Sequence, residues 1–199
     1  MRRVAFAFLL APASLIAAPV AAETAPQRIE AFYDGVTGIM KAAKTLGVAG
    51  RDRAFAPLVA KTYDMATLTR VATGPRWAGL SVADQGALTA ALTRYTTANY
   101  AKNFDGYAGE TFVVDAAPVP RGADVIVKSR IVPKGAPPVA IAYRMRQGAS
   151  GWRVTDVFYA GGVSEVGLRR AEFAAVLARG GAGELIRTLD AKTAGLLKP

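Results

Sequence analysis

The side chains available for acid–base chemistry are carboxylates, lysines, tyrosines and hydroxyls, because the 199-residue sequence contains no histidine and no cysteine. A chain without histidine has no Ser-His-Asp triad, no imidazole base and no ordinary zinc or haem site. A chain without cysteine has no thiol nucleophile, iron–sulfur site or disulfide. The composition therefore predicts neither a metal site nor a cofactor.

Four carboxylates lie in structured contexts, namely Asp64, Glu110, Asp156 and Glu172. No two of them have a spacing that dictates a shared catalytic site. Asp64 has the context of a helix N-cap, and Asp156 lies in an apolar strand, where a buried carboxylate needs a partner. A structural role for Asp156 is favoured over a general base, so we expect a protein that is not an enzyme. An exported enzyme that uses Asp156 is the alternative.

Basic residues outnumber acidic ones by 25 to 15, which gives a formal net charge of +10. Five of them are expected on the outer face of a sheet: Lys128, Arg130, Arg144, Arg146 and Arg153. A basic sheet that binds nucleic acid needs interleaved aromatic side chains, and here the aromatic residues have the opposite parity. We therefore predict no nucleic-acid partner. A solvated face is favoured, with an anionic membrane surface or an acidic partner as the alternative.

The first 22 residues have the pattern of a secretory signal peptide. The basic pair Arg2 and Arg3 is followed by an apolar stretch over residues 4–16 and then by small residues. A membrane anchor is the alternative reading, but prolines weaken the apolar stretch and no basic cluster follows it. We therefore expect export, cleavage after Ala22, and a single mature domain over residues 23–199.

The elements that must position these residues divide the chain into a helical part and a strand part. In the first part, apolar residues recur in steps of three and four, as at Ile29, Phe32 and Val36. Helices are predicted over residues 26–46, 53–61, 64–74 and 81–104, with Pro57 limiting the second. Two further helices close the chain, over residues 164–179 and 184–194.

Between these helices the hydrophobic period changes to two, which is typical of strands. Strands are predicted over residues 111–115, 124–132, 139–146 and 152–159, with turns that suit an antiparallel meander. We therefore predict an α+β fold in which an antiparallel sheet of about four strands packs against several helices. An apolar sheet face under helices can close into a filled core or leave a pocket, and the pattern is compatible with both.

Seven short segments occur in a characteristic order along the chain. They are residues 62–65 (TYDM), 74–81 (GPRWAGLS), 100–104 (YAKNF), 107–112 (YAGETF), 151–157 (GWRVTDV), 161–164 (GGVS) and 169–173 (RRAEF). Together they resemble the MlaC-like family of periplasmic lipid-binding proteins, also described as the toluene-tolerance family. The resemblance extends from about Phe32 to Leu189, and it is the ordered set that is specific.

Residues 162–165 (GVSE), 169–173 (RRAEF) and 121–127 (RGADVIV) look most like the HpnM branch of this family, which is associated with hopanoid lipids. The phospholipid branch usually has a Leu-Val pair after the serine, where this chain has Glu165 and Val166. The resemblance therefore implies a phospholipid or a hopanoid as the ligand.

The resemblance also implies a carrier that shields lipid tails in the periplasm as an auxiliary component of an ABC transporter. Such a carrier exchanges lipid with inner-membrane transport machinery and, in the phospholipid systems that maintain outer-membrane lipid asymmetry, with an outer-membrane lipoprotein complex. We expect a monomer. The lipid-binding candidates, chosen for strand parity and apolar character, are Phe32, Tyr95, Phe104, Val125, Val127, Ile131, Ile141, Tyr143 and Met145. A non-catalytic interaction subunit with a filled core is the remaining alternative.

Overall fold

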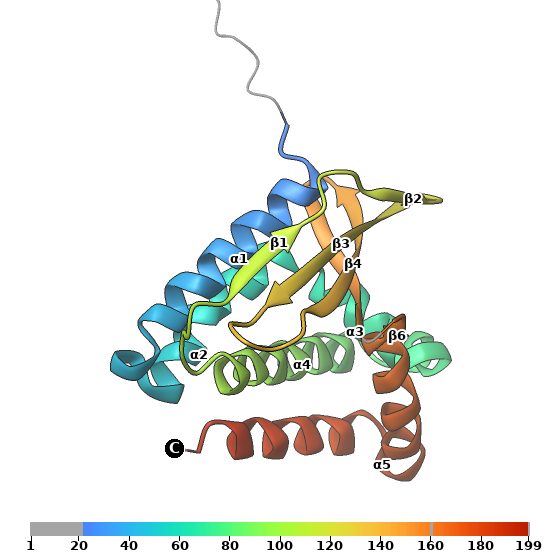
Figure 1. Cartoon of the computed structure of the whole chain (residues 1–199). Helices are drawn as coiled ribbons and strands as arrows, with labels where there is room; N and C mark the ends of the chain where they lie inside the picture. The colour runs from blue at the N-terminus through green and yellow to red at the C-terminus, as the bar shows by residue number, and fades with distance from the viewer. Residues whose placement is uncertain (1–21, 160, 199) are drawn as a thin grey trace, which may run out of the picture.

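Helices α1 to α4 precede the sheet along the chain, and helix α5 follows it (Figure 1). The computed structural model describes residues 22–159 and 161–198. All but the last residue of the predicted signal peptide, residues 1–21, therefore lie outside the described residues. The helices are α1 (Ala25–Lys41), α2 (Ala43–Thr62), α3 (Met65–Thr73), α4 (Val82–Asn103) and α5 (Glu165–Leu196), and a 3-10 helix, η1 (Gly74–Gly79), follows α3. None of the described helices is both long and apolar enough to cross a membrane.

Helix α1 begins at a capping box formed by Thr24 and Gln27. The Gln27 backbone N–H donates to Thr24 Oγ1 at 3.3 Å, and the Thr24 backbone N–H donates to Gln27 Oε1 at 2.8 Å. These bonds pair two N–H groups that the start of a helix otherwise leaves free. Ile29, Phe32 and Val36 are buried along one face of the helix, as their spacing predicts.

Helix α2 differs from the prediction for this segment. Gly47 interrupts the helix with a φ of 59°, as expected for a stop, but the helix resumes immediately and not near Arg53. Pro57, which was expected to limit the helix, lies inside it. The side chains of Phe55 and Val59 on either side are fully buried, and their packing outweighs the backbone hydrogen bond that proline cannot donate.

The sheet is antiparallel throughout and contains six strands in the described part of the chain. They are β1 (Thr111–Val114), β2 (Val119–Arg121), β3 (Asp124–Val132), β4 (Val139–Gly148), β5 (Gly151–Tyr159) and β6 (Val163–Ser164). The order is β1-β3-β4-β5-β6, and β2 pairs with the other end of β3. The four predicted strands are confirmed as β1, β3, β4 and β5. Strands β2 and β6, with three and two residues, are too short to show a period in the sequence.

The helices gather on one face of the sheet, which we call the inner face (Figure 1). Val127, Ile141 and Tyr143 are buried on this face, whereas Lys128 and Arg130 on the opposite parity are exposed. This alternation in the middle of β3 and β4 arises because a pleated strand turns successive side chains to opposite faces. A bulge at Arg144/Met145 shifts the register between β4 and β5.

Helix α5 is bent at Gly180 and Gly181, where both residues leave the helical conformation. The half before the bend contacts α3, since Arg170 Nε donates to the Val71 carbonyl at 2.9 Å. The half after the bend runs alongside α4 (Figure 1), where Arg94 and Asp190 form an ion pair at 2.5 Å. The two predicted C-terminal helices are therefore the two halves of α5, separated by the glycines expected to end the first.

Candidate functional site

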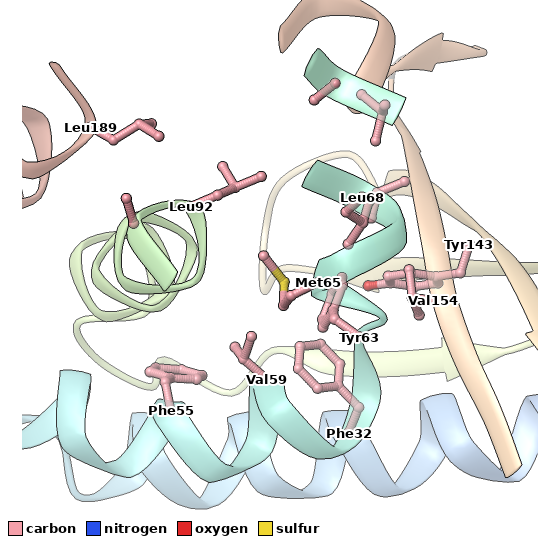
Figure 2. Close-up of a cluster of buried hydrophobic side chains, with 14 of the residues drawn as sticks. Phe32, Phe55, Val59, Tyr63, Met65, Leu68, Leu92, Tyr143, Val154 and Leu189 are labelled. Carbon is pink, nitrogen blue, oxygen red and sulfur yellow. The ribbon is translucent and has the colours of Figure 1, made fainter. Parts of the chain in front are cut away.

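A cavity of about 380 Å³ lies between the inner face of the sheet and helices α1, α3, α4 and the first half of α5. Its volume is within the range of roughly 300–1,000 Å³ that is typical of small-molecule sites. Helix α3 contributes Met65 and Leu68, and α4 contributes Leu92. Figure 2 shows Leu92 pointing toward these two residues. The alternative of a completely filled core is therefore wrong for this part of the molecule.

The structure brings five of the nine predicted pocket residues together in the cavity wall. They are Phe32, Phe104, Ile131, Ile141 and Tyr143. The four predicted residues that do not line the cavity are Tyr95, Val125, Val127 and Met145. All nine are predicted from parity and apolar character, which indicate the direction of a side chain but not whether open volume lies beside it.

The four residues outside the cavity have separate structural positions. Val127 and Met145 are fully buried within the hydrophobic core, with Val125 packed against it. Val125 and Met145 are cross-strand partners near the end of the sheet that lies away from Val139 and Ile141. The ring of Tyr95 lies beneath the guanidinium of Arg169, whose Cζ is 4.8 Å from the ring centre. These positions correct the predicted extent of the pocket.

Sequence reasoning missed the contribution of α3 and of Tyr63, two residues before it. Met65 and Leu68 lie three positions apart on the buried face of α3, and Tyr63 caps the preceding helix. Their spacing identified a buried helix face. It carried no signal that this face meets open volume, because that depends on how far α3 stands from the sheet.

Tyrosine hydroxyls form two hydrogen-bonded groups in the cavity wall. Tyr33 Oη lies 2.8 Å from Tyr143 Oη and 2.8 Å from Ser129 Oγ. Ser129 Oγ in turn donates to the Ile141 carbonyl at 3.1 Å. The hydroxyls of Tyr63 and Tyr100 are hydrogen-bonded to each other. Figure 2 shows the Tyr143 hydroxyl directed from the sheet toward Tyr63 and Met65.

Burial keeps these tyrosines in the neutral form. It raises the pKa of Tyr63 and of Tyr143 well above the usual value of 10.0, and the neighbouring tyrosine hydroxyls add to the increase. Burial also raises the pKa of Tyr33 and Tyr100. The pKa of Tyr159 rises to about 12 through burial and the nearby carboxylate of Glu165. None of these groups is poised to act as a base near neutral pH.

Four amide or charged side chains also line the cavity, and we call this polar part of the wall the mouth. Asn99 and Asn103 of α4 and the ion-paired Glu165 and Arg169 of α5 contribute to it. Arg169 Nη2 and Glu165 Oε1 are 2.5 Å apart in this pair. Val139, at the start of β4, lines the cavity but is 48% exposed, so the wall continues to the protein surface.

Asp156, the carboxylate considered for catalysis, holds the start of α5. Its Oδ2 accepts from Ser164 Oγ at 2.7 Å, and its Oδ1 accepts from the backbone N–H groups of Val157 at 2.8 Å and Val166 at 3.2 Å. A carboxylate with three donors is a structural anchor, as expected for a buried acid. Asp156 does not line the cavity.

The other three acids also have local partners. Asp64 caps α3 by accepting from the Thr67 N–H at 2.9 Å, Glu110 accepts from the Ala108 N–H at 2.8 Å, and Glu172 pairs with Lys192. Across residues 22–159 and 161–198, no cluster of three acidic side chains is arranged to hold a metal ion. These acids therefore form no catalytic constellation.

The outer face of the sheet is basic, and part of its charge is neutralised locally. Arg144 Nε and Arg146 Nε lie 3.2 and 2.6 Å from the buried carboxylate of Asp124. Arg130 lies 3.5 Å from Asp115, while Arg153 donates to the carbonyl of Ala60 in α2. This pattern favours a solvated, internally paired face.

The sequence profile of one protein family, described as MlaC protein, matches residues 30–191. The fold is also similar to a solved structure of a phospholipid-binding protein from Ralstonia solanacearum in complex with a phospholipid. That protein is 24% identical in sequence with a TM-score of 0.77, and the match covers 88% of this chain and 100% of that chain. No curated protein gives a significant match.

Proposed function

Since the chain belongs to the MlaC protein family, we propose that it is a lipid carrier that holds apolar tails in the cavity between sheet and helices. The family is one of periplasmic lipid-binding proteins without enzymatic activity, which agrees with the prediction that the protein is not an enzyme. The observation that carries the proposal is the cavity of about 380 Å³, whose wall is mainly aliphatic and aromatic. Of the described residues that line it, only Glu165 is acidic.

The driving force for binding is removal of hydrocarbon from water. Burial of each methylene group contributes about 0.8 kcal/mol, so a lipid tail enters an apolar cavity much more readily than it enters water. We assign contact with the tail to Phe32, Phe104, Ile131, Ile141 and Tyr143, which line the cavity. The remaining predicted residues support the wall from the core.

The lipid headgroup is proposed to lie at the mouth. Asn99 and Asn103 offer neutral hydrogen-bonding groups there, and Arg169 offers a cation that Glu165 already pairs. An anionic headgroup would compete with Glu165 for Arg169, because guanidinium groups bind phosphate and carboxylate oxygens in a similar geometry.

The chemical class of the lipid is the finer part of the proposal. The solved relative of similar fold contains a phospholipid, which supports a phospholipid as ligand. Residues 121–127, 162–165 and 169–173 resemble the HpnM branch, which supports a hopanoid. We propose that the protein carries one of these two classes, and both are included in the test below.

Location and partners follow from the same proposal. We propose that residues 1–22 are a signal peptide removed on export and that residues 23–199 form one lipid-binding domain in the periplasm. The monomeric carrier would exchange lipid with an inner-membrane transporter and, if its ligand is a phospholipid, with an outer-membrane lipoprotein complex.

Lipid retention by delipidated protein tests the carrier function. The protein is incubated separately with labelled phospholipid and labelled hopanoid and passed over a sizing column, with each lipid alone as the control. A carrier elutes with one of the lipids at the position of the monomer. Mass spectrometry of an organic extract of the untreated protein then identifies the natural ligand. Protein that retains neither lipid and yields none on extraction is not a carrier.

A further inference from the structure

The tyrosine hydroxyls in the cavity wall have an order of donors and acceptors that can be assigned. Ser129 Oγ lies 3.1 Å from the Ile141 carbonyl, which can only accept, so the Ser129 proton is used there. Tyr33 must therefore donate to Ser129 Oγ, from which it is 2.8 Å distant. With the Tyr33 proton used in this way, Tyr143 must donate to Tyr33 Oη across 2.8 Å.

This order leaves Tyr143 with no proton to offer and with a free acceptor position on its oxygen. No other hydrogen bond reaches Tyr143 Oη within residues 22–159 and 161–198. Tyr143 is 2% exposed and lines the cavity, so bulk solvent does not serve this oxygen. Tyr143 therefore gives the cavity wall a hydrogen-bond acceptor that has no donor among the described residues.

The second group supplies the complementary donor. Tyr63 and Tyr100 are hydrogen-bonded to each other, and only one of the two hydroxyls can donate in that bond. The other hydroxyl keeps its proton without an acceptor in this part of the structure. Tyr63 and Tyr100 both line the same cavity as Tyr143, and Phe32 contacts both of their rings.

We propose that the cavity selects lipids whose buried part carries a hydroxyl group, which donates to Tyr143 and accepts from the Tyr63–Tyr100 pair. A hydroxyl is the small group that both donates and accepts, so one placed between Tyr143 and the Tyr63–Tyr100 pair would satisfy both unused positions. This proposal rests on the proposed carrier function and specifies the ligand further. A tail made only of hydrocarbon leaves both positions unpaired in an apolar space, which costs binding free energy.

Competition between matched fatty acids tests this selectivity. Delipidated protein is offered equal amounts of deuterated stearate and one monohydroxystearate, with the hydroxyl placed at successive carbons in separate experiments. The protein is recovered on a sizing column, and the two acids are measured in its organic extract by mass spectrometry. We expect at least one hydroxyl position to be recovered in about tenfold excess over stearate, the effect of one to two added hydrogen bonds.

Tyrosine variants identify the source of the preference. Tyr143→Phe removes the acceptor and is expected to bring the recovered ratio down to about one or below, since a buried hydroxyl without a partner is unfavourable. The double variant Tyr63→Phe/Tyr100→Phe removes the donor and should move the ratio in the same direction. Tyr107→Phe is the matched control, because Tyr107 is exposed and does not line the cavity. It should keep the wild-type ratio.

Two outcomes overturn the proposal while leaving the carrier function intact. One is equal recovery of stearate and of every hydroxystearate by the wild-type protein. The other is a preference that stays at the wild-type ratio both in Tyr143→Phe and in the double variant Tyr63→Phe/Tyr100→Phe. Failure to retain any fatty acid, phospholipid or hopanoid counts instead against the carrier function itself. The readout is a ratio within one sample, and circular dichroism of each variant verifies that the fold is retained.

Discussion

Phe32 joins the tyrosines of the cavity wall into one aromatic cluster. Its ring is 5.7 Å from Tyr63 and 5.5 Å from Tyr100, both close to edge-on. Tyr100 stacks in turn on Phe104 at 5.7 Å. Such pairs contribute about 0.5–1.5 kcal/mol beyond the burial of their surface. Part of the cavity wall is therefore fixed by mutual aromatic contacts, while Met65, Leu68 and Leu92 supply aliphatic surface.

A larger side chain at Ile141 should fill the cavity. Ile141 is nearly buried and lines the cavity, so Ile141→Trp places a large ring where we propose that the tail lies. We expect the lipid bound per protein to fall well below half the wild-type amount, with a loss of about 1–3 kcal/mol in unfolding free energy from overpacking. The measurement is lipid in an organic extract after loading, with circular dichroism to verify folding.

Val82→Trp is the control for this substitution because Val82 is 85% exposed and lies outside the cavity. It should retain the full lipid capacity. Unchanged loading in folded Ile141→Trp would show that the tail lies elsewhere. Val127 is less suitable for this test, since it is buried in the core away from the cavity wall.

Removal of the Asp156 carboxylate should destabilise the start of α5. Asp156→Ala leaves Ser164 Oγ and two backbone N–H groups without their acceptor, and we expect a loss of about 1–3 kcal/mol in unfolding free energy. Asp190→Ala is the control, because the Arg94–Asp190 pair is exposed and surface pairs contribute about 0–1 kcal/mol. Urea unfolding measures both, and equal losses would argue against an anchoring role for Asp156.

At the scale of helices and strands, hydrophobic periodicity predicted nearly all of the fold. The four longer strands and the break in α5 at Gly180 and Gly181 follow from periods of two and 3.6 and from glycine. Periodicity failed where an element is too short to repeat, as in β2, or where tertiary packing overrides local preference, as at Pro57. These failures affect boundaries and small edge strands but leave the layers unchanged.

The candidate site was less predictable than the fold, as Val127 and Ile141 illustrate. Both lie on the inner face, and their sequence patterns are equivalent. Only Ile141 lines the cavity, because α3 and the first half of α5 leave space over its end of the sheet. That spacing depends on the directions of several helices at once, and no local pattern in the sequence encodes it.

The bend in α5 should depend on Gly181. This residue has a φ of 66° and a ψ of −161°, a conformation that is available essentially to glycine alone. We expect Gly181→Ala to lower the unfolding free energy by about 1–3 kcal/mol. Gly183→Ala, two residues along in the helical part of α5, should be neutral or stabilise by up to about 1 kcal/mol. Thermal or urea unfolding of the two variants measures these effects. Equal changes in Gly181→Ala and Gly183→Ala would contradict a special role for Gly181.

At the scale of the whole molecule, the buried tyrosines should make stability decrease in alkali. The unfolded chain releases their protons near pH 10, whereas the raised pKa values of Tyr33, Tyr63, Tyr100 and Tyr143 keep these protons in the folded state. The unfolded state then binds fewer protons, so the unfolding free energy falls as the pH rises, by up to about 1.4 kcal/mol per pH unit for each tyrosine. The stability that these four tyrosines contribute is fully present below about pH 10 and decreases above it.

Urea unfolding followed by circular dichroism at pH 9, 10 and 11 measures this slope. Tyr159, whose pKa is raised to about 12 and which lies partly exposed at the end of β5, provides a variant that should still fold. Tyr159→Phe is expected to reduce the slope relative to the wild type. An unfolding free energy that stays constant from about pH 9 to 11 would contradict burial of these hydroxyls.

The bend in α5 also has a kinetic consequence for the molecule. Its first half bears Glu165, Val166 and Arg169 of the cavity wall, while its second half is fixed along α4, with Gly181 between them. A rotation at Gly181 that widens the mouth must therefore also release the contacts of the first half, which are the Arg170–Val71 bond and the Asp156 bonds at the start of α5. Lipid exchange through this mouth would then be timed by release of these contacts, and strengthening them should alter how quickly cargo enters and leaves more than how tightly it is held.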